Sequence, residues 1–268
     1  MSNYIDLHNH ILPAIDDGPQ TMPEAIDLAR AMVDAGFGTV VATPHACEGK
    51  PAPAEIFKRT SAFQAELNRQ GIPLKILPGS EQHIEPALLE RLQKKEALTL
   101  NNTRYLLLEL PFFQPLPPYT LTLIDNLVTA GYVPLIAHPE RASDLQANPN
   151  LISELHQAGA LFQLTWSALT GKIGPAAHRV AHSMVEAGLG HFFATDAHSA
   201  SGRLMKLEKS SAIIAEMLGP AALEELLITR PARLLADQPL DLPLAQEDLL
   251  ETGGKLPLIS RLRRHIGR

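Results

Sequence analysis

The chain has little cysteine and no long apolar run. Its single cysteine, Cys47, excludes an intramolecular disulfide framework and a zinc site built from several thiolates. No apolar stretch reaches the roughly 18 residues that a membrane-spanning helix needs. The first ten residues, MSNYIDLHNH, contain no basic patch followed by an apolar segment, so we expect no signal peptide. These absences predict a soluble cytoplasmic protein.

Positive charge is also scarce. The 268 residues carry 23 Lys and Arg against 29 Asp and Glu, a formal net charge of −6. Proteins that coat nucleic acid are usually basic, so this balance argues against a nucleic-acid partner and against a nuclease. Hydrophobic residues make up 45% of the chain and charged residues 19%, an ordinary composition for a chain with a folded core.

The composition changes near residue 237. Residues 237–251 are rich in proline and acids, whereas residues 255–268 carry Lys255 and four arginines and no acid. We therefore expect one domain over residues 1–236 and a flexible tail over 237–268. The alternative for the basic end is an amphipathic segment that touches anionic lipid or an acidic partner.

Short apolar runs alternate with amphipathic segments before the tail. The runs lack apolar–polar alternation, which is typical of parallel strands covered on both faces. The predicted strands are Tyr4–Leu7, Gly38–Thr43, Leu74–Leu77, Tyr105–Leu110, Val133–Ala137, Leu161–Thr165 and His191–Thr195. The predicted helices are Pro23–Ala35, Ala54–Gln70, Pro86–Lys95, Thr120–Ala130, Asn150–Ala158, Pro175–Ala187 and Met205–Leu218. Seven βα units favour an α/β barrel or a doubly wound sheet.

Ionisable side chains follow six of these seven strands. Residues two apart in an extended chain point to the same side, so His8 with His10, and Asp196 with His198, can each offer two ligands to one centre. Active sites of α/β barrels lie at the carboxyl ends of the strands, where all of these side chains would meet. Imidazole and carboxylate together suit zinc, manganese or iron. The candidates at strand ends are His8, His10, His45, Glu81, Glu109, His138, Asp196 and His198.

The remaining histidines lack this repetition, and we assign them capping or core roles. They are His83, His156, His178, His182, His191 and His265.

Six motifs in order resemble those of the PHP (polymerase and histidinol phosphatase) superfamily. They are DLHNHILPAIDDGP, ATPHACEGK, GSEQHIEP, LLLELP, IAHPERA and ATDAHSASGR, and the resemblance covers residues 4 to about 236. The chain most resembles the bacterial manganese-dependent protein-tyrosine phosphatases of capsule and exopolysaccharide loci, the CpsB/YwqE type. The opening block is specific for that branch.

The resemblance implies a distorted (β/α)7 barrel with three divalent ions at the carboxyl ends of its strands. Manganese is the first choice of metal, with iron, zinc or magnesium as alternatives. Arg141 and Arg203 match phosphate-binding arginines, and Asp16 is left with a local turn role. The implied metal ligands are His8, His10, Asp17, His45, Glu81, Glu109, His138, Asp196 and His198.

The implied reaction is hydrolysis of a phosphomonoester by a metal-bound hydroxide. Resemblance suggests a phosphotyrosine protein as substrate, namely a membrane-attached tyrosine kinase that drives polysaccharide export, so the enzyme would work at the inner membrane face. A thiol route is excluded on spacing, because a cysteine phosphatase needs arginine six positions after its cysteine and Cys47 meets Pro53 there.

Three alternatives stay open: a histidinol-phosphate-type phosphatase, a nuclease of the same superfamily, and a binding module without catalysis. The segment Pro111–Tyr119 follows Glu109 and is expected to wall the pocket. Its aromatic residues either stack on a phenyl ring or simply pack.

Overall fold

The computed structural model describes residues 3–201, 207–246 and 250. Its strands form two parallel sheets, one in the order β1-β2-β4 and one in the order β3-β5-β6-β7-β8-β9. The strands are β1 (Tyr4–Asn9), β2 (Phe37–Ala42), β3 (His45–Ala46), β4 (Lys75–Pro78), β5 (Glu81–His83), β6 (Tyr105–Glu109), β7 (Val133–Ala137), β8 (Leu161–Thr165) and β9 (Phe192–Ala194).

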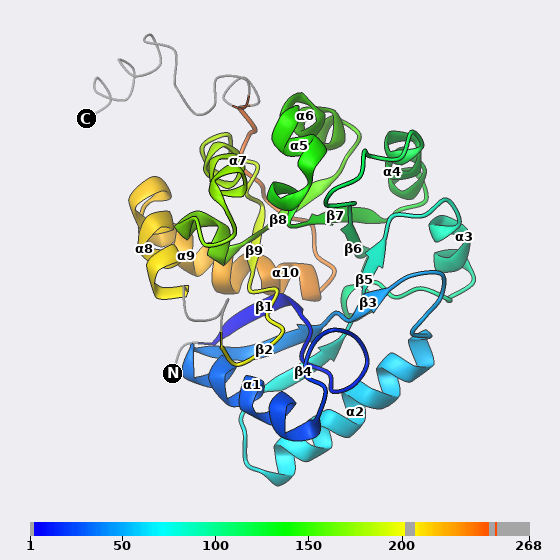
Figure 1. Cartoon of the computed structure of the whole chain (residues 1–268), viewed down its shortest axis with the longest axis vertical. Helices are drawn as coiled ribbons and strands as arrows, with labels where there is room; N and C mark the ends of the chain where they lie inside the picture. Colours follow the sequence, from blue (N-terminus) through cyan, green and yellow to red (C-terminus); the bar gives the residue numbers. More distant parts are fainter. Residues whose placement is uncertain (1–2, 202–206, 247–249, 251–268) are drawn as a thin grey trace.

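Helices surround the strands, which occupy the middle of the molecule in Figure 1. The longer helices are α1 (Met22–Asp34), α2 (Pro53–Arg69), α4 (Thr120–Thr129), α6 (Asn150–Gln157), α7 (Pro175–Glu186) and α8 (Leu207–Leu218). Shorter helical segments are α3 (Leu88–Gln93), η1 (Leu100–Asn102), η2 (Pro139–Arg141), α5 (Ser143–Ala147), η3 (Trp166–Thr170), α9 (Ala221–Glu224), the π-helical turn η5 (Glu225–Thr229) and α10 (Arg230–Leu235).

Two segments of the chain each contribute one strand to both sheets. β3 follows β2 after two residues, and β5 follows β4 after two residues, so each long strand continues into the other sheet. At the far edge the β9 end returns to β1, because His10 N donates to Ala197 O across 3.0 Å and Asp196 N donates to His8 O across 3.0 Å. The predicted α/β class with parallel strands is confirmed. The contact between the first and last strands is an isolated bridge between Asn9 and Ala197.

Helix α1 illustrates how the sequence fixes the elements around the site. Thr21 caps it: the Thr21 hydroxyl accepts from Glu24 N, and the Glu24 side chain accepts from Thr21 N. Pro23 lies in the first turn, where a missing N–H carries no penalty. One face, including Leu28 and Met32, is fully buried. The cap thereby ends the preceding loop, which carries Asp16 and Asp17.

The start of the expected tail contacts the α/β domain. Asp237 Oδ1 accepts from Arg104 N at 2.9 Å and from Arg104 Nε at 3.0 Å. Further on, Gln246 N donates to Ala187 O, and Leu250 is buried. The basic segment 255–268 lies outside the described residues, so a domain boundary at 236 and a flexible tail stay predictions. Within the described ranges, no helix combines the length and apolar character needed to cross a membrane.

Candidate metal centre

Glu81 stands at the middle of a cluster of imidazoles. Its carboxylate oxygen Oε2 lies 3.2 Å from His8 Nε2 and 3.3 Å from His10 Nε2, both at the end of β1. The other oxygen, Oε1, lies 2.8 Å from His138 Nε2, directly after β7. All four side chains are buried. Three strand ends that are distant in sequence thus meet at one carboxylate.

Asp17 lies on the solvent-facing side of this cluster. Its Oδ1 lies 3.2 Å from His198 Nε2, 3.6 Å from His45 Nε2 and 3.8 Å from His10 Nδ1. The Asp17 side chain is 63% exposed, whereas those of His10 and Glu81 are fully buried. The centre therefore runs from a dry interior to an open rim, where a ligand can enter from solvent.

All nine predicted ligands lie in this region. Asp196 Oδ1 is 3.6 Å from His8 Nε2 and 3.5 Å from His10 Nε2. The other eight predicted ligands, together with His83, fall in four overlapping groups, and the candidate ligand atoms of each group lie within 4.8 Å of one another, close enough to share an ion. These groups are His8–His10–Glu81, Glu81–Glu109–His138, His10–Asp17–His45–His198 and His45–His83–Glu109.

Several buried atoms of the cluster have no hydrogen-bond partner among the described residues. They are Glu81 Oε2, His45 Nδ1 and His138 Nδ1. The first two nevertheless lie 3.0 Å apart, an ion-pair distance. A buried carboxylate oxygen left in this state is costly unless a charge compensates it. Oxygen and imidazole donors without thiolate suit manganese, iron or zinc. The residues present therefore fit divalent cations, although ligation by each residue stays a prediction.

Two further side chains fix the orientation of the β1 histidines. Gln163 Nε2 donates to Leu164 O at 2.8 Å, so its Oε1 faces His8 Nδ1 at 2.7 Å. An amide oxygen can only accept, so His8 Nδ1 carries a proton and His8 Nε2 is the nitrogen that faces the cluster. Asp16 Oδ2 accepts from His10 Nδ1 at 2.7 Å with the same result. Such partners raise the affinity of histidine ligands for metal.

Asp16 therefore does more than the local turn role that the sequence predicts. That role is present, because Gly18 N donates to Asp16 Oδ1 at 3.0 Å. The second oxygen, however, serves His10 and also accepts from His45 N. Gln163 was not predicted at all. Its only signal in the sequence is a polar residue inside the apolar run LFQLT of β8.

Charge in the cluster shifts the pKa of its members. Burial alone would raise the pKa of the Glu81 carboxyl, but the neighbouring imidazoles of His8 and His10 hold it well below its usual range. Burial alone would lower the pKa of His10, but Asp16 and Glu81 hold it well above its usual range. The raised pKa of His10 favours its protonated form, so a cation that binds His10 must displace a proton.

His83 is the residue that sequence reasoning misplaced. We expected a capping or core role, yet its Nε2 lies 2.8 Å from Glu109 Oε2 and its side chain is 46% exposed at the mouth of the centre. Its position two residues after Glu81 on β5 puts both side chains on one side of the strand, which was the available signal. Elsewhere His191 fits its expected core role: it is buried, and its Nδ1 accepts from Phe162 N.

The two strand-end residues His138 and Asp196 have left-handed backbones. Their φ angles are 31° and 49°. Residues other than glycine adopt this region at a cost of order 1–3 kcal/mol and are found preferentially at functional sites. His138 directly follows β7 and Asp196 follows β9 by two residues, and both side chains belong to the cluster.

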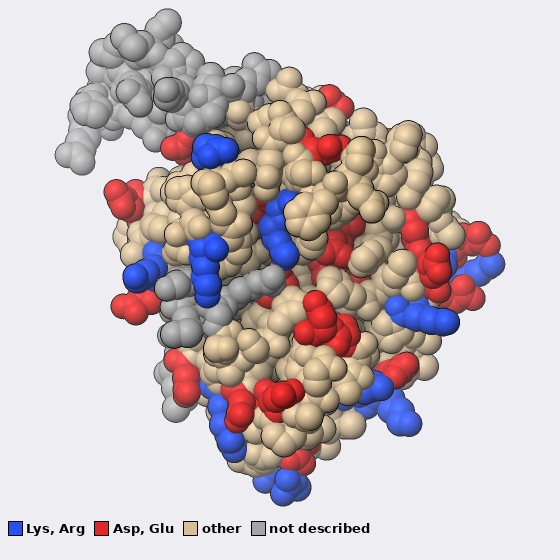
Figure 2. Space-filling view, viewed as in Figure 1, with Lys and Arg blue, Asp and Glu red and all other residues tan. Residues whose placement is uncertain are grey.

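Arg141 is the predicted phosphate-binding arginine that the structure describes. Its Nη1 donates to Asp196 Oδ2 at 3.0 Å, and its guanidinium carbon lies 4.2 Å from the ring centroid of Phe112. Arg203 lies outside the described residues. Figure 2 shows acidic side chains around the central hollow of this face with basic side chains at its edge.

Cys47 is exposed, two residues beyond His45. Burial, and after it Glu85 and Glu48, raise the pKa of the Cys47 thiol. A nucleophilic cysteine needs a lowered pKa. This direction agrees with the bystander role predicted from spacing.

A family model described as "Capsular polysaccharide synthesis, CpsB/CapC" matches residues 4–236. The chain belongs to this family. It is 38% identical over 217 residues to the tyrosine-protein phosphatase YwqE of Bacillus subtilis, a match that covers 80% of this chain and 85% of that protein. It is 30% identical over 238 residues to the tyrosine-protein phosphatase CpsB of Streptococcus agalactiae serotype III, covering 86% and 98%.

Solved structures agree with the CpsB/CapC assignment. The chain matches a structure from a study of YwqE from Bacillus subtilis and CpsB from Streptococcus pneumoniae, described as metal-dependent tyrosine phosphatases. The TM-score is 0.85 at 36% identity, with 90% of this chain and 98% of that chain covered. A β-aspartyl dipeptidase from Fervidobacterium islandicum reaches a TM-score of 0.57 at 14% identity, which shows shared fold alone.

Proposed function

We propose that this CpsB/CapC chain is a metal-dependent protein-tyrosine phosphatase that hydrolyses phosphotyrosine in proteins. The observation that carries the proposal is the convergence of nine His, Asp and Glu side chains at strand ends that begin with His8 and end with His198. The relatives YwqE and CpsB are tyrosine-protein phosphatases, which supports phosphotyrosine as the substrate class.

The proposed cofactor is a set of three divalent ions, with manganese as the first choice. The ligands are His8, His10, Asp17, His45, Glu81, Glu109, His138, Asp196 and His198. Bound divalent ions supply Lewis acidity and an activated water for the hydrolysis of a phosphomonoester. The protein supplies the rest: a fixed donor set and histidine tautomers held by Gln163 and Asp16.

Two arginines are proposed to hold the phosphoryl group. Arg141 reaches the cluster from η2, and its planar guanidinium suits forked hydrogen bonds to phosphoryl oxygens. Arg203 is proposed for the same role on the basis of its motif position. As charge builds on the phosphoryl oxygens during hydrolysis, such contacts stabilise the transition state. The phenolate leaving group has a pKa near 10, so it departs with little help from a proton donor.

The proposed protein substrate is a membrane-attached tyrosine kinase of polysaccharide export. The family description, capsular polysaccharide synthesis, supports this choice of process. We place the enzyme in the cytoplasm, at the inner membrane face, where the phosphorylated tail of such a kinase would be exposed.

The test compares three substrates with manganese-loaded, full-length protein. We expect hydrolysis of a phosphotyrosine peptide to exceed that of histidinol phosphate and of a phosphodiester by at least about tenfold, because the leaving groups differ in pKa and shape. Preference for histidinol phosphate would replace the proposal with its small-molecule alternative. Glu81→Gln serves as the inactive control, since it removes the central carboxylate with little change in volume.

A further inference from the structure

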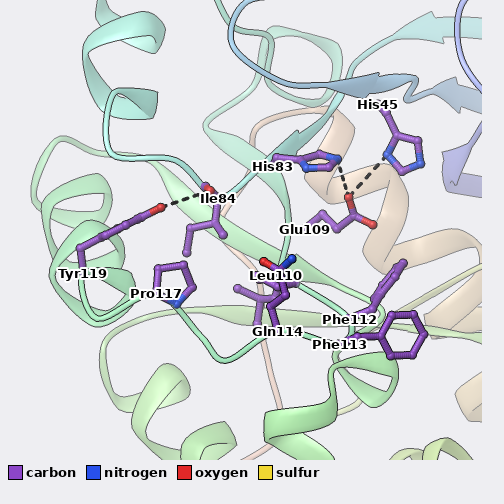
Figure 3. A pocket seen from close by; sticks show the side chains of 11 residues that line it. His45, His83, Ile84, Glu109, Leu110, Phe112, Phe113, Gln114, Pro117 and Tyr119 are labelled. Atoms are coloured by element: carbon purple, nitrogen blue, oxygen red, sulfur yellow. Dashed lines mark hydrogen bonds and ion pairs between the residues drawn. The ribbon is translucent and has the colours of Figure 1, made fainter.

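An apolar hollow of about 700 Å³ opens beside the metal centre (Figure 3). This volume lies in the range typical of pockets that take small organic groups. One edge of the hollow is polar and consists of His45, His83 and Glu109, which also belong to the metal centre. The hollow and the centre are therefore continuous. Its apolar walls are Ile84, Leu110, Phe112, Phe113, Pro117 and Tyr119.

We propose that this hollow is the subsite for the aromatic ring of an aryl phosphate, and that Phe113 is the residue that selects it. The inference rests on the proposed phosphatase function and deepens it. A phosphoryl group held at the metal centre carries its ester oxygen and ring outward. The wall that contains Phe112 and Phe113 lines the same hollow as Glu109 and His83.

Phe113 is 91% exposed, an unusual state for a phenylalanine. Its ring lies against that of Phe112 edge to face, with centroids 6.2 Å apart and an interplanar angle of 72°. A third ring that entered the hollow would find an aromatic face and edge at once, the arrangements that aromatic pairs prefer. A saturated chain would gain less from the same wall.

The position of the wall is tied to the phosphate-binding machinery. The ring of Phe112 lies 4.2 Å from the guanidinium carbon of Arg141, a cation–π distance, and 5.1 Å from the ring centroid of His138. At the far end, the Tyr119 hydroxyl lies 3.5 Å from Ile84 O and links the loop after β6 to the chain after β5 (Figure 3). The wall that contains Phe112 thus lies directly beside Arg141.

Two other hollows formed by the described residues also border the centre and have different chemistry. One is lined by charged side chains that include Lys50, Glu55 and Arg59. The other is lined by Glu24 and Asp27 together with His198. A phenyl ring placed in either would remove water from charged groups and meet no phenylalanine or tyrosine ring in return. The aromatic hollow is therefore the one that fits a ring.

The test measures binding of two phosphonates that cannot be hydrolysed, by calorimetry with the metal-loaded full chain. Phenylphosphonate and methylphosphonate present the same anion and differ in the ring. We expect phenylphosphonate to bind about 10- to 100-fold more tightly than methylphosphonate. Phe113→Ala should reduce this ratio at least about threefold, and Phe113→Tyr, which keeps the ring, should preserve it.

Leu244→Ala is the matched control, since Leu244 is an equally exposed apolar residue, 92%, outside this hollow. It should leave the ratio unchanged. Equal binding of the two phosphonates, or a ratio that Phe113→Ala leaves intact, overturns the aryl subsite. Since Phe113 makes few contacts, its truncation is not expected to unfold the chain, and circular dichroism verifies this. Failure to hydrolyse any phosphomonoester overturns the proposed function instead, so the two failures are distinguishable.

Discussion

Arg141 donates a hydrogen bond to Asp196 across 3.0 Å, so a proposed phosphate-binding group touches a proposed metal ligand directly. Arg141 remains 26% exposed while the Asp196 side chain is 2% exposed. The cation therefore sits where solvent meets the dry centre. A phosphoryl group that enters from solvent would meet this guanidinium beside the metals.

Removal of Arg141 should slow turnover. For Arg141→Ala we expect kcat to fall by about 10²–10³, the loss typical for one transition-state contact in a shielded site, with bound metal unchanged. Arg141→Lys should recover part of it, since it keeps the charge but loses the fork. Arg69→Ala, which breaks an exposed pair with Glu66, is the control. Turnover near wild type with full metal content would make Arg141 a bystander, and loss of metal would make it a support for Asp196.

Metal removal should abolish activity and lower stability together. After dialysis against EDTA we expect no hydrolysis, and manganese should restore more activity than magnesium. Cations that bind only the folded chain should raise the free energy of unfolding by about 2.7 kcal/mol at a hundredfold excess over Kd. Glu81→Gln should lose most of this response in thermal unfolding. Full activity in excess EDTA would exclude a metal-dependent mechanism.

Loss of the carboxylate that orients His10 should weaken metal binding. Asp16→Asn keeps the shape of the side chain but removes its negative charge. Only one of the two terminal atoms of an amide accepts hydrogen bonds, so the acceptor for His10 Nδ1 is weakened. We expect metal affinity to fall about 10- to 100-fold in competition with a chelating dye. Asp34→Asn, at the end of α1, is the matched control. Equal affinities for the two variants would reduce Asp16 to its turn role.

The thiol of Cys47 should be dispensable. Because its pKa is raised and no arginine stands at the phosphatase spacing, Cys47→Ser should keep most activity, and mass spectrometry should detect no phosphocysteine. A fall of more than about 10³-fold in kcat, the scale for loss of a true nucleophile, would contradict this.

His191 should make the fold sensitive to acid. Burial, with His156 and Arg230 nearby, lowers the pKa of His191 to about 3. The unfolded chain binds this proton near pH 6.5, so the free energy of unfolding should fall as pH drops from about 6.5 towards 3.

Between pH 7 and pH 5 this loss amounts to about 2 kcal/mol. His191→Asn removes the titration but keeps an acceptor for Phe162 N. Urea unfolding at both pH values should show a smaller loss for the variant than for the wild type. An identical loss in both proteins would exclude His191 as the titrating group.

The longer strands followed from local patterns, whereas their order in the two sheets and their long-range partners did not. Apolar runs such as Val133–Ala137 mark buried parallel strands because both faces are covered. The strands β3 and β5, of two and three residues, are too short for any periodicity to show. They exist because β2 and β4 continue past a bend.

The candidate site likewise combines contacts that the sequence predicts with contacts that it does not. Pairs such as His8 with His10 can be read from spacing because neighbours on one strand share a side. The contact of Gln163 with His8 joins residues 155 positions apart, and only the return of the sheet to β1 creates it. The stacking of Phe112 on Arg141 likewise depends on how the segment after β6 packs against η2, which local sequence patterns do not predict.

The proposed ligands span almost the whole described chain, from His8 in β1 to His198 after β9. During synthesis on the ribosome, His8 and His10 emerge long before Asp196 and His198. A nascent chain therefore cannot present the full donor set until its last strand has been translated and has closed onto β1. Metal binding would therefore follow the synthesis of the chain. The ion that binds would depend on the cations available to the finished protein rather than to the growing chain.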